Sequence, residues 1–346
     1  LSHYGVRGKA LEWFRSYLSD REQYVFLNDN SSDFRKINCG VPQGSILGPL
    51  LFILYINDFC RSSDILSFVL FADDINLFFS HKDPHRLVEI INIEMRNILS
   101  WIRANKLSLN IQKTKYTLFS KSINSLPANI IFENTPLECV SFNTFLGVTV
   151  DQKLSWRNHI DNICKIISRN IGIIYKVKTC LPLNSLIMLY SSMILPYLNY
   201  GLLVWGNTHQ TLLDKVFLLQ KKIIRIICNS PFRSHTDALF FDNKILKVKD
   251  LYFFQLGQFM YNYNNNMLPS VFQEMFFKNS SVHNYPTRHS DDFHLPLLRT
   301  LSAQKTFIYE GQKFWNSLSG EIKNAPSINT FKKKLKLFLL KSYTPH

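Results

Sequence analysis

The feature that most limits how this chain can fold is the run of residues 66–79, LSFVLFADDINLFF. Two apolar runs flank a small residue and two aspartates, and each run has the length and side chains typical of a β-strand. We therefore expect a β-hairpin with Asp73 and Asp74 at its tip. An isolated Asp-Asp pair is most often only a turn, because aspartate is a preferred turn residue. Here the apolar flanks predict a deeply buried hairpin that fixes both carboxylates where a divalent cation can reach them.

The rest of the first 150 residues alternates short strands with helices, a pattern typical of an α+β fold. Helices are predicted at residues 10–18, 49–56 and 85–103, and the second lies in an apolar run that we expect to be buried. Short strands are predicted at residues 23–27, 34–39, 107–110, 116–119, 130–132, 137–140 and 145–150. A flexible loop with two glycines and a proline is expected at residues 40–44.

After Asp151 the pattern changes to amphipathic helices. One predicted helix carries an isoleucine stripe at positions 160, 163, 167, 171 and 174, and basic residues at positions 165, 169 and 176 on its other face. Further basic helices are expected at residues 212–228 and 331–340, and loops at 262–266 and 278–292. The remainder of the chain is therefore predicted to be helical and basic.

The charge of the chain points to a polyanionic partner. It has 40 Lys and Arg against 25 Asp and Glu, a formal net charge of +15. Residues 1–120 hold 14 basic and 12 acidic side chains, a net of +2, whereas residues 121–346 hold 26 and 13, a net of +13. Such an excess indicates nucleic acid or an anionic membrane surface, although lysines opposite an apolar stripe are as often only the solvated face of a helix. A hydrophobic fraction of 46% excludes disorder as the main state.

A membrane-embedded protein is the alternative suggested by residues 179–213, which contain no Asp, Glu, Lys or Arg. A spanning helix needs about 20 consecutive apolar residues. Pro182, Pro196, Asn199 and Gly201 interrupt this segment, so we expect buried helices and no membrane partner. The six cysteines form no C-x-x-C pair, which indicates neither zinc nor disulfides and favours an intracellular location, in the nucleus or the cytoplasm.

Several motifs resemble those of one enzyme family. Phe71-Ala72-Asp73-Asp74 resembles the catalytic hairpin of reverse transcriptases, and Gly40-Val41-Pro42-Gln43-Gly44 upstream resembles the Pro-Gln-Gly motif of the same family. Leu107-Ser108-Leu109-Asn110 with Lys113 is similar to the lysine motif, and Phe145-Leu146-Gly147 is similar to the primer grip. Two motifs in the right order are much stronger than either alone.

Downstream segments resemble the thumb side of non-LTR retrotransposon polymerases of the jockey-like group. They are Leu154-Ser155-Trp156 with His159-Ile160, Tyr197-Leu198-Asn199-Tyr200-Gly201, and Trp205-Gly206. Beyond residue 206 the resemblance is looser, and Tyr285-Pro286-Thr287-Arg288 and Trp315-Asn316 recur in such elements without an assigned role.

The resemblance implies an RNA-directed DNA polymerase that transfers a nucleotide to a primer 3′-hydroxyl with two Mg²⁺ ions, Mn²⁺ being the alternative. Asp73 would be the principal metal ligand and Asp74 its neighbour, while Lys113 would be a general acid or else an ordinary surface lysine. Pro42, Gln43, Gly44 and Ser45 would line the nucleotide and template pocket, and Phe145, Leu146 and Gly147 would seat the primer terminus. The implied partners are an RNA template, a DNA primer or target, and deoxynucleotide triphosphates; no oligomeric state is implied.

One required segment of the family is missing. Reverse transcriptases need a further metal-binding aspartate in a Phe-x-x-Val/Ala-Phe-Asp strand before the Pro-Gln-Gly motif, and this sequence contains no such segment. We therefore expect an α+β right-hand polymerase palm at residues 1–150 without its first catalytic strand, a helical thumb at 151–210 and a basic helical C-terminal region at 211–346. The start Leu-Ser-His-Tyr-Gly is expected to be a cut in a longer chain. The 346 residues alone are predicted to be inactive, and a non-catalytic nucleic-acid-binding remnant is the alternative.

Overall fold

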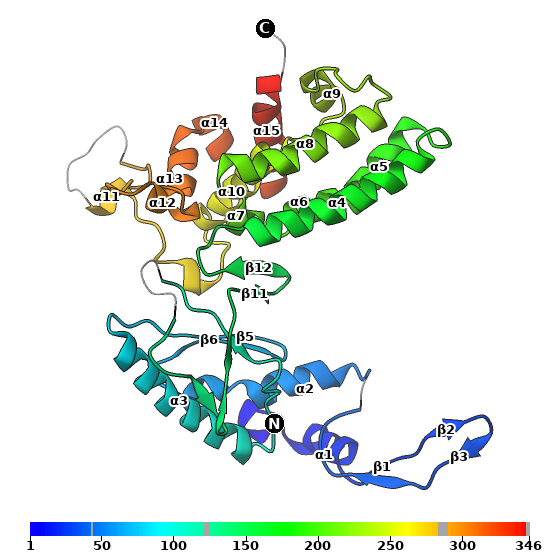
Figure 1. Ribbon diagram of the computed structural model, residues 1–346, viewed down its shortest axis with the longest axis vertical. Helices are drawn as coiled ribbons and strands as arrows, with labels where there is room; N and C mark the ends of the chain where they lie inside the picture. The colour runs from blue at the N-terminus through cyan, green and yellow to red at the C-terminus, as the bar shows by residue number, and fades with distance from the viewer. Residues whose placement is uncertain (43, 121–124, 283–289, 344–346) are drawn as a thin grey trace. The chain divides into compact units, whose positions relative to one another are not determined.

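The computed structural model describes residues 1–42, 44–120, 125–282 and 290–343 (Figure 1). By its internal contacts the chain divides into two compact units, Leu1–Tyr116 with Ile123–Glu138 and Thr117–Ser122 with Cys139–His346. The mixture of helices and strands confirms the predicted α+β class. The finer division at residues 150 and 210 remains a prediction. Gln43 and the segment 285–288 lie outside the described residues.

The first unit combines three α-helices with short strands among its described residues. Its helices are η1 (Ser2–Tyr4), α1 (Gly8–Leu18), α2 (Leu47–Ile56), η2 (Phe59–Ser62) and α3 (Pro84–Ala104), η denoting a 3-10 helix. Its strands are β1 (Arg21–Gln23), β2 (Phe26–Leu27), β3 (Asn30–Ser31), β4 (Arg35–Ile37), β5 (Ser67–Phe71), β6 (Asp74–Phe78), β7 (Lys115–Tyr116), β8 (Ile131–Phe132), β9 (Thr135–Pro136) and β10 (Glu138–Cys139). They form two-stranded sheets that pair β1 with β4, β2 with β3, β5 with β6, β7 with β10 and β8 with β9.

Helix α3 provides the main support for this unit. It begins where the Asp83 side chain accepts a hydrogen bond from the His85 backbone N–H (2.9 Å) and where proline occupies the first helical position. Its buried face, with Ile98 and Ile102, packs with residues of α2, η2, β5 and β6 into one core. The helices predicted at 10–18 and 85–103 are thus confirmed. The strand predicted at 107–110 is wrong: the segment is irregular, because Leu107 and Leu109 pack on the core while its backbone pairs with no strand.

Helix α2 forms as predicted but is not buried as predicted. Leu50, Ile53 and Tyr55 are 53%, 52% and 45% exposed. Apolar side chains occupy every side of this helix, and among the described residues only the side with Phe52 and Ile56 contacts the core. The burial prediction fails because continuous apolarity does not specify which side of a helix is covered.

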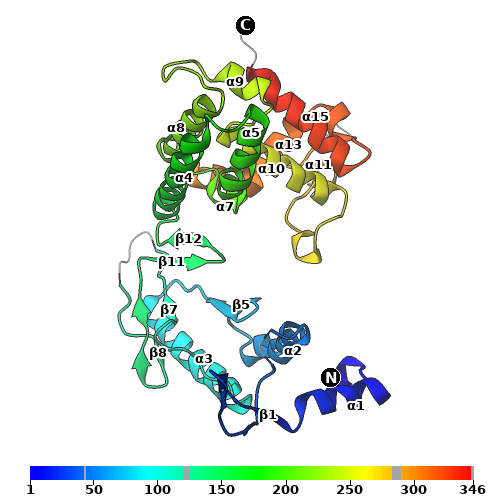
Figure 2. The same ribbon diagram turned by 90° about the vertical axis from the view of Figure 1, so that its right-hand side faces the viewer.

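The second unit is mainly helical. Its elements are β11 (Phe142–Phe145), β12 (Val148–Asp151), α4 (Arg157–Val177), α5 (Leu183–Met193), α6 (Leu195–Asn199), α7 (Leu202–Trp205), α8 (Gln210–Ile227), α9 (Asp237–Asp242), α10 (Val248–Asn264), η3 (Ser270–Phe272), α11 (Asn279–Val282), α12 (Leu301–Gln304), α13 (Phe307–Ser317), α14 (Gly320–Lys323), α15 (Ile328–Leu340) and η4 (Lys341–Tyr343). Figures 1 and 2 show α4, α5 and α8 side by side, with α10 and α15 packed beside them.

The core of the second unit confirms the isoleucine stripe. All five isoleucines predicted on one face of α4 are buried, and they pack with α5 to α8, α10 and α15. The uncharged segment 179–213 forms α5, α6, α7 and the start of α8, and its Tyr190, Leu198 and Trp205 are fully buried in this core. None of the described helices combines the length and the apolarity needed to cross a membrane.

Two predictions about local structure in this unit are wrong, and the loop predicted at 278–292 contains the short helix α11 (Asn279–Val282). The strand predicted at 145–150 is interrupted at Leu146 and Gly147, both at positive φ (46° and 77°), and the chain reverses there into a hairpin. The loop predicted at 262–266 begins later, because α10 continues to Asn264. Tertiary packing of Tyr261 and Tyr263 on this last turn outweighs the weak helix preference of the asparagines.

Candidate functional site

Strands β5 and β6 place the two aspartates at the end of a tight hairpin. The register pairs Phe71 with Asp74, so only Ala72 and Asp73 connect the strands, and Ala72 adopts a positive φ of 51°. Asp73 and Asp74 are both exposed, and neither carboxylate makes a hydrogen bond or an ion pair with the described residues. The prediction of a hairpin with an open acidic tip is confirmed.

In the part of the chain that the structure describes, the hairpin is anchored on one face only. Because side chains alternate along a strand, Phe68, Leu70, Ile75 and Leu77 face the core of the first unit. The Phe68 ring meets Phe59 edge to face, with their centroids 5.5 Å apart. On the other face Val69, Phe71 and Phe78 are 43%, 60% and 47% exposed, so the predicted deep burial of the hairpin is wrong. One packed face is still enough to fix the direction of the tip.

The donor chemistry of the tip fits a hard divalent cation, but the ligand set is incomplete. Mg²⁺ prefers six oxygen ligands, and the carboxylates of Asp73 and Asp74 are of the right kind and free of competing cations among the described residues. The described part of the chain contains no group of three or more His, Cys, Asp or Glu side chains that could hold a metal ion. Two adjacent carboxylates by themselves are therefore expected to bind such an ion weakly.

The residues of the predicted nucleotide pocket lie just before α2. Pro42 is exposed, and Gly44 has a φ of 79°, which favours glycine. The Ser45 hydroxyl accepts a hydrogen bond from the Gly48 backbone N–H (3.0 Å), which helps to start the helix. A Cβ on Gly48 would lie 2.9 Å from that hydroxyl oxygen, so glycine permits this close approach. Their role in nucleotide binding remains a prediction.

Lys113 lies in an exposed turn after α3. Its backbone N–H donates to the Asn110 carbonyl oxygen (3.1 Å) and side-chain Oδ1 (3.2 Å). No hydrogen bond or ion pair joins the Lys113 ammonium to the described residues, Asp73 and Asp74 included. Its predicted part as a general acid thus remains a prediction.

The predicted primer grip, Phe145, Leu146 and Gly147, is the turn of the β11–β12 hairpin in the second unit. Tyr200 donates a hydrogen bond from its hydroxyl to the Leu146 carbonyl oxygen, and the Thr149 backbone N–H donates to Nδ1 of His159 (3.2 Å). The Trp205 ring meets the His159 ring edge to face, with their centroids 5.7 Å apart. Tyr200, His159 and Trp205 belong to segments that resemble the thumb side of the family, and no sequence signal linked them to the primer grip.

His159 should make the stability of this unit sensitive to acid. It is 4% exposed, and burial lowers its pKa below the ordinary 6.5. Because the pKa of His159 is lower in the folded state, the unfolded chain binds the proton more tightly. The folded state therefore keeps its full stability above pH 6.5, and it loses stability as the pH falls through the lower pKa of the folded state. We expect the free energy of unfolding, from urea titrations, to fall as the pH drops below 6.5, and to fall less steeply in His159→Gln. Equal slopes in both proteins would contradict this expectation.

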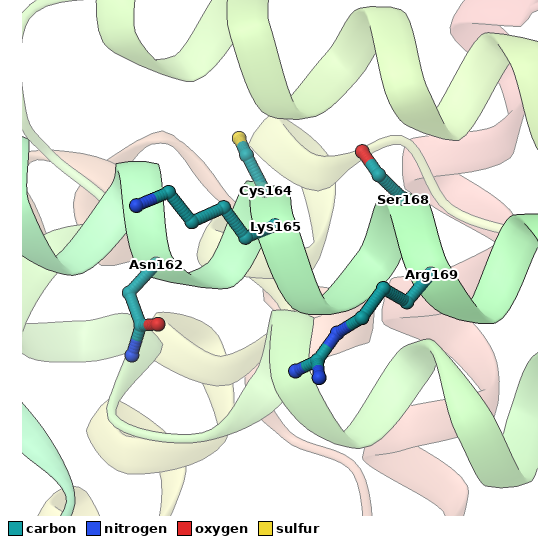
Figure 3. A pocket seen from close by; sticks show the side chains of 5 residues that line it. All are labelled: Asn162, Cys164, Lys165, Ser168 and Arg169. Carbon is teal, nitrogen blue, oxygen red and sulfur yellow. The ribbon is translucent and has the colours of Figure 1, made fainter.

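A basic face runs along α4. A shallow surface hollow is lined by Asn162, Cys164, Lys165, Ser168 and Arg169 (Figure 3). Lys165 and Arg169 are exposed and form no ion pair with the described residues. They lie four residues apart, about 6 Å along the helix axis. Two uncompensated cations at this spacing suit neighbouring phosphates of a nucleic-acid backbone.

Comparison with known proteins supports the class suggested by the motifs. Residues 1–150 match the family "Reverse transcriptase (RNA-dependent DNA polymerase)". This match includes the hairpin with Asp73 and Asp74 and the loop before α2.

The chain is also similar to three retrotransposon polymerases of Drosophila melanogaster. It is 25% identical over 243 residues to the "Probable RNA-directed DNA polymerase from transposon X-element", covering 68% of this chain and 27% of that protein. The "RNA-directed DNA polymerase from mobile element jockey" is 26% identical over 247 residues, with the same shares, 68% and 27%. The "Probable RNA-directed DNA polymerase from transposon BS" is 26% identical over 259 residues, 72% of this chain and 28% of that protein.

The chain therefore spans little more than a quarter of the length of these relatives. The resemblance to reverse transcriptases of non-LTR retrotransposons, inferred above from the motifs, is confirmed.

Proposed function

We propose that residues 1–150 supply part of the palm of an RNA-directed DNA polymerase, and that Asp73 and Asp74 are its hairpin carboxylates. The observation that carries this proposal is the open tip of the β5–β6 hairpin, where two unpaired carboxylates stand on a strand pair anchored from one side. The thumb and the basic helical region would follow it. The partners would be an RNA template, a DNA primer or target, and deoxynucleotide triphosphates, inside the cell.

The residues of this chain would position the reacting groups. Asp73 and Asp74 would hold Mg²⁺ or Mn²⁺, which supplies charge neutralisation for the attacking hydroxyl and the leaving pyrophosphate in nucleotidyl transfer. The loop at Pro42, Gln43, Gly44 and Ser45 would contact the incoming nucleotide, Gly44 by close approach of its backbone. The β11–β12 turn would seat the primer end, and Lys113 would donate a proton to pyrophosphate.

The test is a chimera in which residues 1–150 replace the matching segment of the jockey polymerase. That polymerase would supply the aspartate strand that the family needs and this sequence does not contain. We expect the folded chimera to extend a DNA primer on an RNA template, measured as labelled product on a denaturing gel. A chimera that folds and binds the primed template but yields no product would overturn the proposal.

The 346 residues alone should show no template-directed synthesis in the same assay. Two carboxylates cannot position two metal ions, because a two-metal site needs ligands from both sides of the pair. Synthesis by this chain that disappears in Asp73→Ala would refute this expectation.

A second candidate function is sequence-independent nucleic-acid binding without catalysis, favoured by the basic face of α4. The logarithm of the binding constant falls linearly with the logarithm of the salt concentration, and on a duplex each phosphate contact makes this slope more negative by about 0.9. Replacing Lys165 and Arg169 by Gln should therefore make the slope for an RNA–DNA duplex shallower by roughly 1 to 2. Replacing the exposed Lys313 and Lys333 by Gln removes the same charge from α13 and α15 and is the control. Equal slopes for the two double variants would exclude the α4 face.

A further inference from the structure

The β11–β12 hairpin is held in place by side chains to which the family resemblance assigns no individual role. Its two turn residues, Leu146 and Gly147, both have positive φ, and for leucine this conformation is strained. Such a turn persists only where its surroundings fix it.

Tyr200 provides the contact that fixes the turn. Its hydroxyl donates to the Leu146 carbonyl oxygen, and its ring lies against Gly147, where an added Cβ would be 3.3 Å from Cε1 of the tyrosine. Tyr200 is 56% exposed, so packing in the core does not explain its position. The contacts of Tyr200 with the hairpin are therefore contacts with the turn residues Leu146 and Gly147.

Tyr200 is itself anchored from the core. The Trp205 indole N–H donates to the Tyr200 carbonyl oxygen (2.8 Å), and Trp205 is fully buried. Gly201, at a φ of 61°, allows this chain segment to reach Val148, because a Cβ there would lie 2.9 Å from Cγ2 of the valine. Figures 1 and 2 show the hairpin next to α4 and α7. Helix α4 carries His159 and α7 carries Trp205, while Tyr200 and Gly201 form the link between α6 and α7.

We propose that Tyr200 is a positioning residue that sets the orientation of the Phe145-Leu146-Gly147 turn and so the placement of the primer 3′ end. This inference rests on the proposed function, since it requires the turn to meet the primer. The ring and backbone of Tyr200 act through the turn and need not touch the reacting atoms.

The experiment uses the full chain and an RNA template annealed to a DNA primer that ends in 4-thiothymidine. Irradiation should crosslink the primer end to residues 142–151, identified by mass spectrometry. Tyr200→Phe removes only the hydroxyl and should lower this crosslink about fivefold, the population change expected for one lost hydrogen bond. Total duplex affinity, from fluorescence anisotropy, should change less than twofold. Tyr197→Phe is the matched control, because the Tyr197 hydroxyl makes no hydrogen bond with the described residues.

A second measurement needs no nucleic acid. Hydrogen exchange in residues 142–151 should be faster in Tyr200→Phe than in the wild type or Tyr197→Phe, while α4 and α8 keep their protection. Equal crosslinking and equal exchange in Tyr200→Phe would overturn the role of Tyr200 and leave the proposed function intact. A wild-type chain that binds the duplex but never crosslinks through residues 142–151 would overturn both this inference and the assignment of the turn to the primer.

Discussion

Asp73→Asn in the chimera with the jockey polymerase should lower RNA-templated DNA synthesis by about 10³-fold or more. Asparagine keeps the size of the side chain and one oxygen but removes the charge that binds the ion. Such a loss corresponds to about 4 kcal/mol of transition-state stabilisation, within the several kcal/mol that a bound metal ion contributes. The measurement is the initial rate of primer extension under saturating nucleotide.

The control for this variant is Asp64→Asn. Asp64 is an exposed carboxylate just before β5 and makes no hydrogen bond or ion pair with the described residues. It should retain at least half of the rate, because its charge lies outside the hairpin tip. Comparable losses in both variants would show that general charge, and not the tip, is responsible.

Trp205→Ala should destabilise the second unit by about 3–5 kcal/mol, the range for removing a large buried aromatic side chain. Trp205 is fully buried, donates to the Tyr200 carbonyl oxygen and packs against His159, so the substitution leaves a cavity and an unpaired acceptor. The free energy of unfolding is obtained from urea titrations followed by far-ultraviolet circular dichroism, since this unit is mainly helical.

Val204→Ala is the matched control for Trp205→Ala. Val204 is the preceding residue of α7 and is 56% exposed, so its truncation should change stability by less than about 0.5 kcal/mol. A loss below 1 kcal/mol for Trp205→Ala would mean that the contacts of the indole ring do not hold this part of the unit together.

Local patterns predicted much of the fold. The five isoleucines of α4 specify one buried face by their spacing alone, and the apolar runs around Asp73 and Asp74 specify a hairpin. Spacing was not informative for α2, where apolar residues surround the whole helix and its covered side depends on tertiary contacts. The hairpin burial was overestimated for the same reason, because residue type does not tell how many faces are covered.

The candidate site could be predicted only as far as its motifs are continuous in sequence. The tip of the β5–β6 hairpin is local, so Asp73 and Asp74 were found. The supports of the β11–β12 hairpin come from distant positions: Tyr200 lies 54 residues after Leu146 in the turn, and His159 lies 10 residues after Thr149 in β12. No periodicity or turn preference connects such distant positions, and only the folded backbone brings them together.

Binding of Mn²⁺ to the 346-residue chain, followed by electron paramagnetic resonance, tests the central claim most directly. We expect weak binding, about millimolar as at the weaker carboxylate sites of proteins. It should be lost in Asp73→Asn and retained in Asp64→Asn. A titration that is the same for the wild type and Asp73→Asn would contradict the account, because the hairpin tip would then hold no divalent ion.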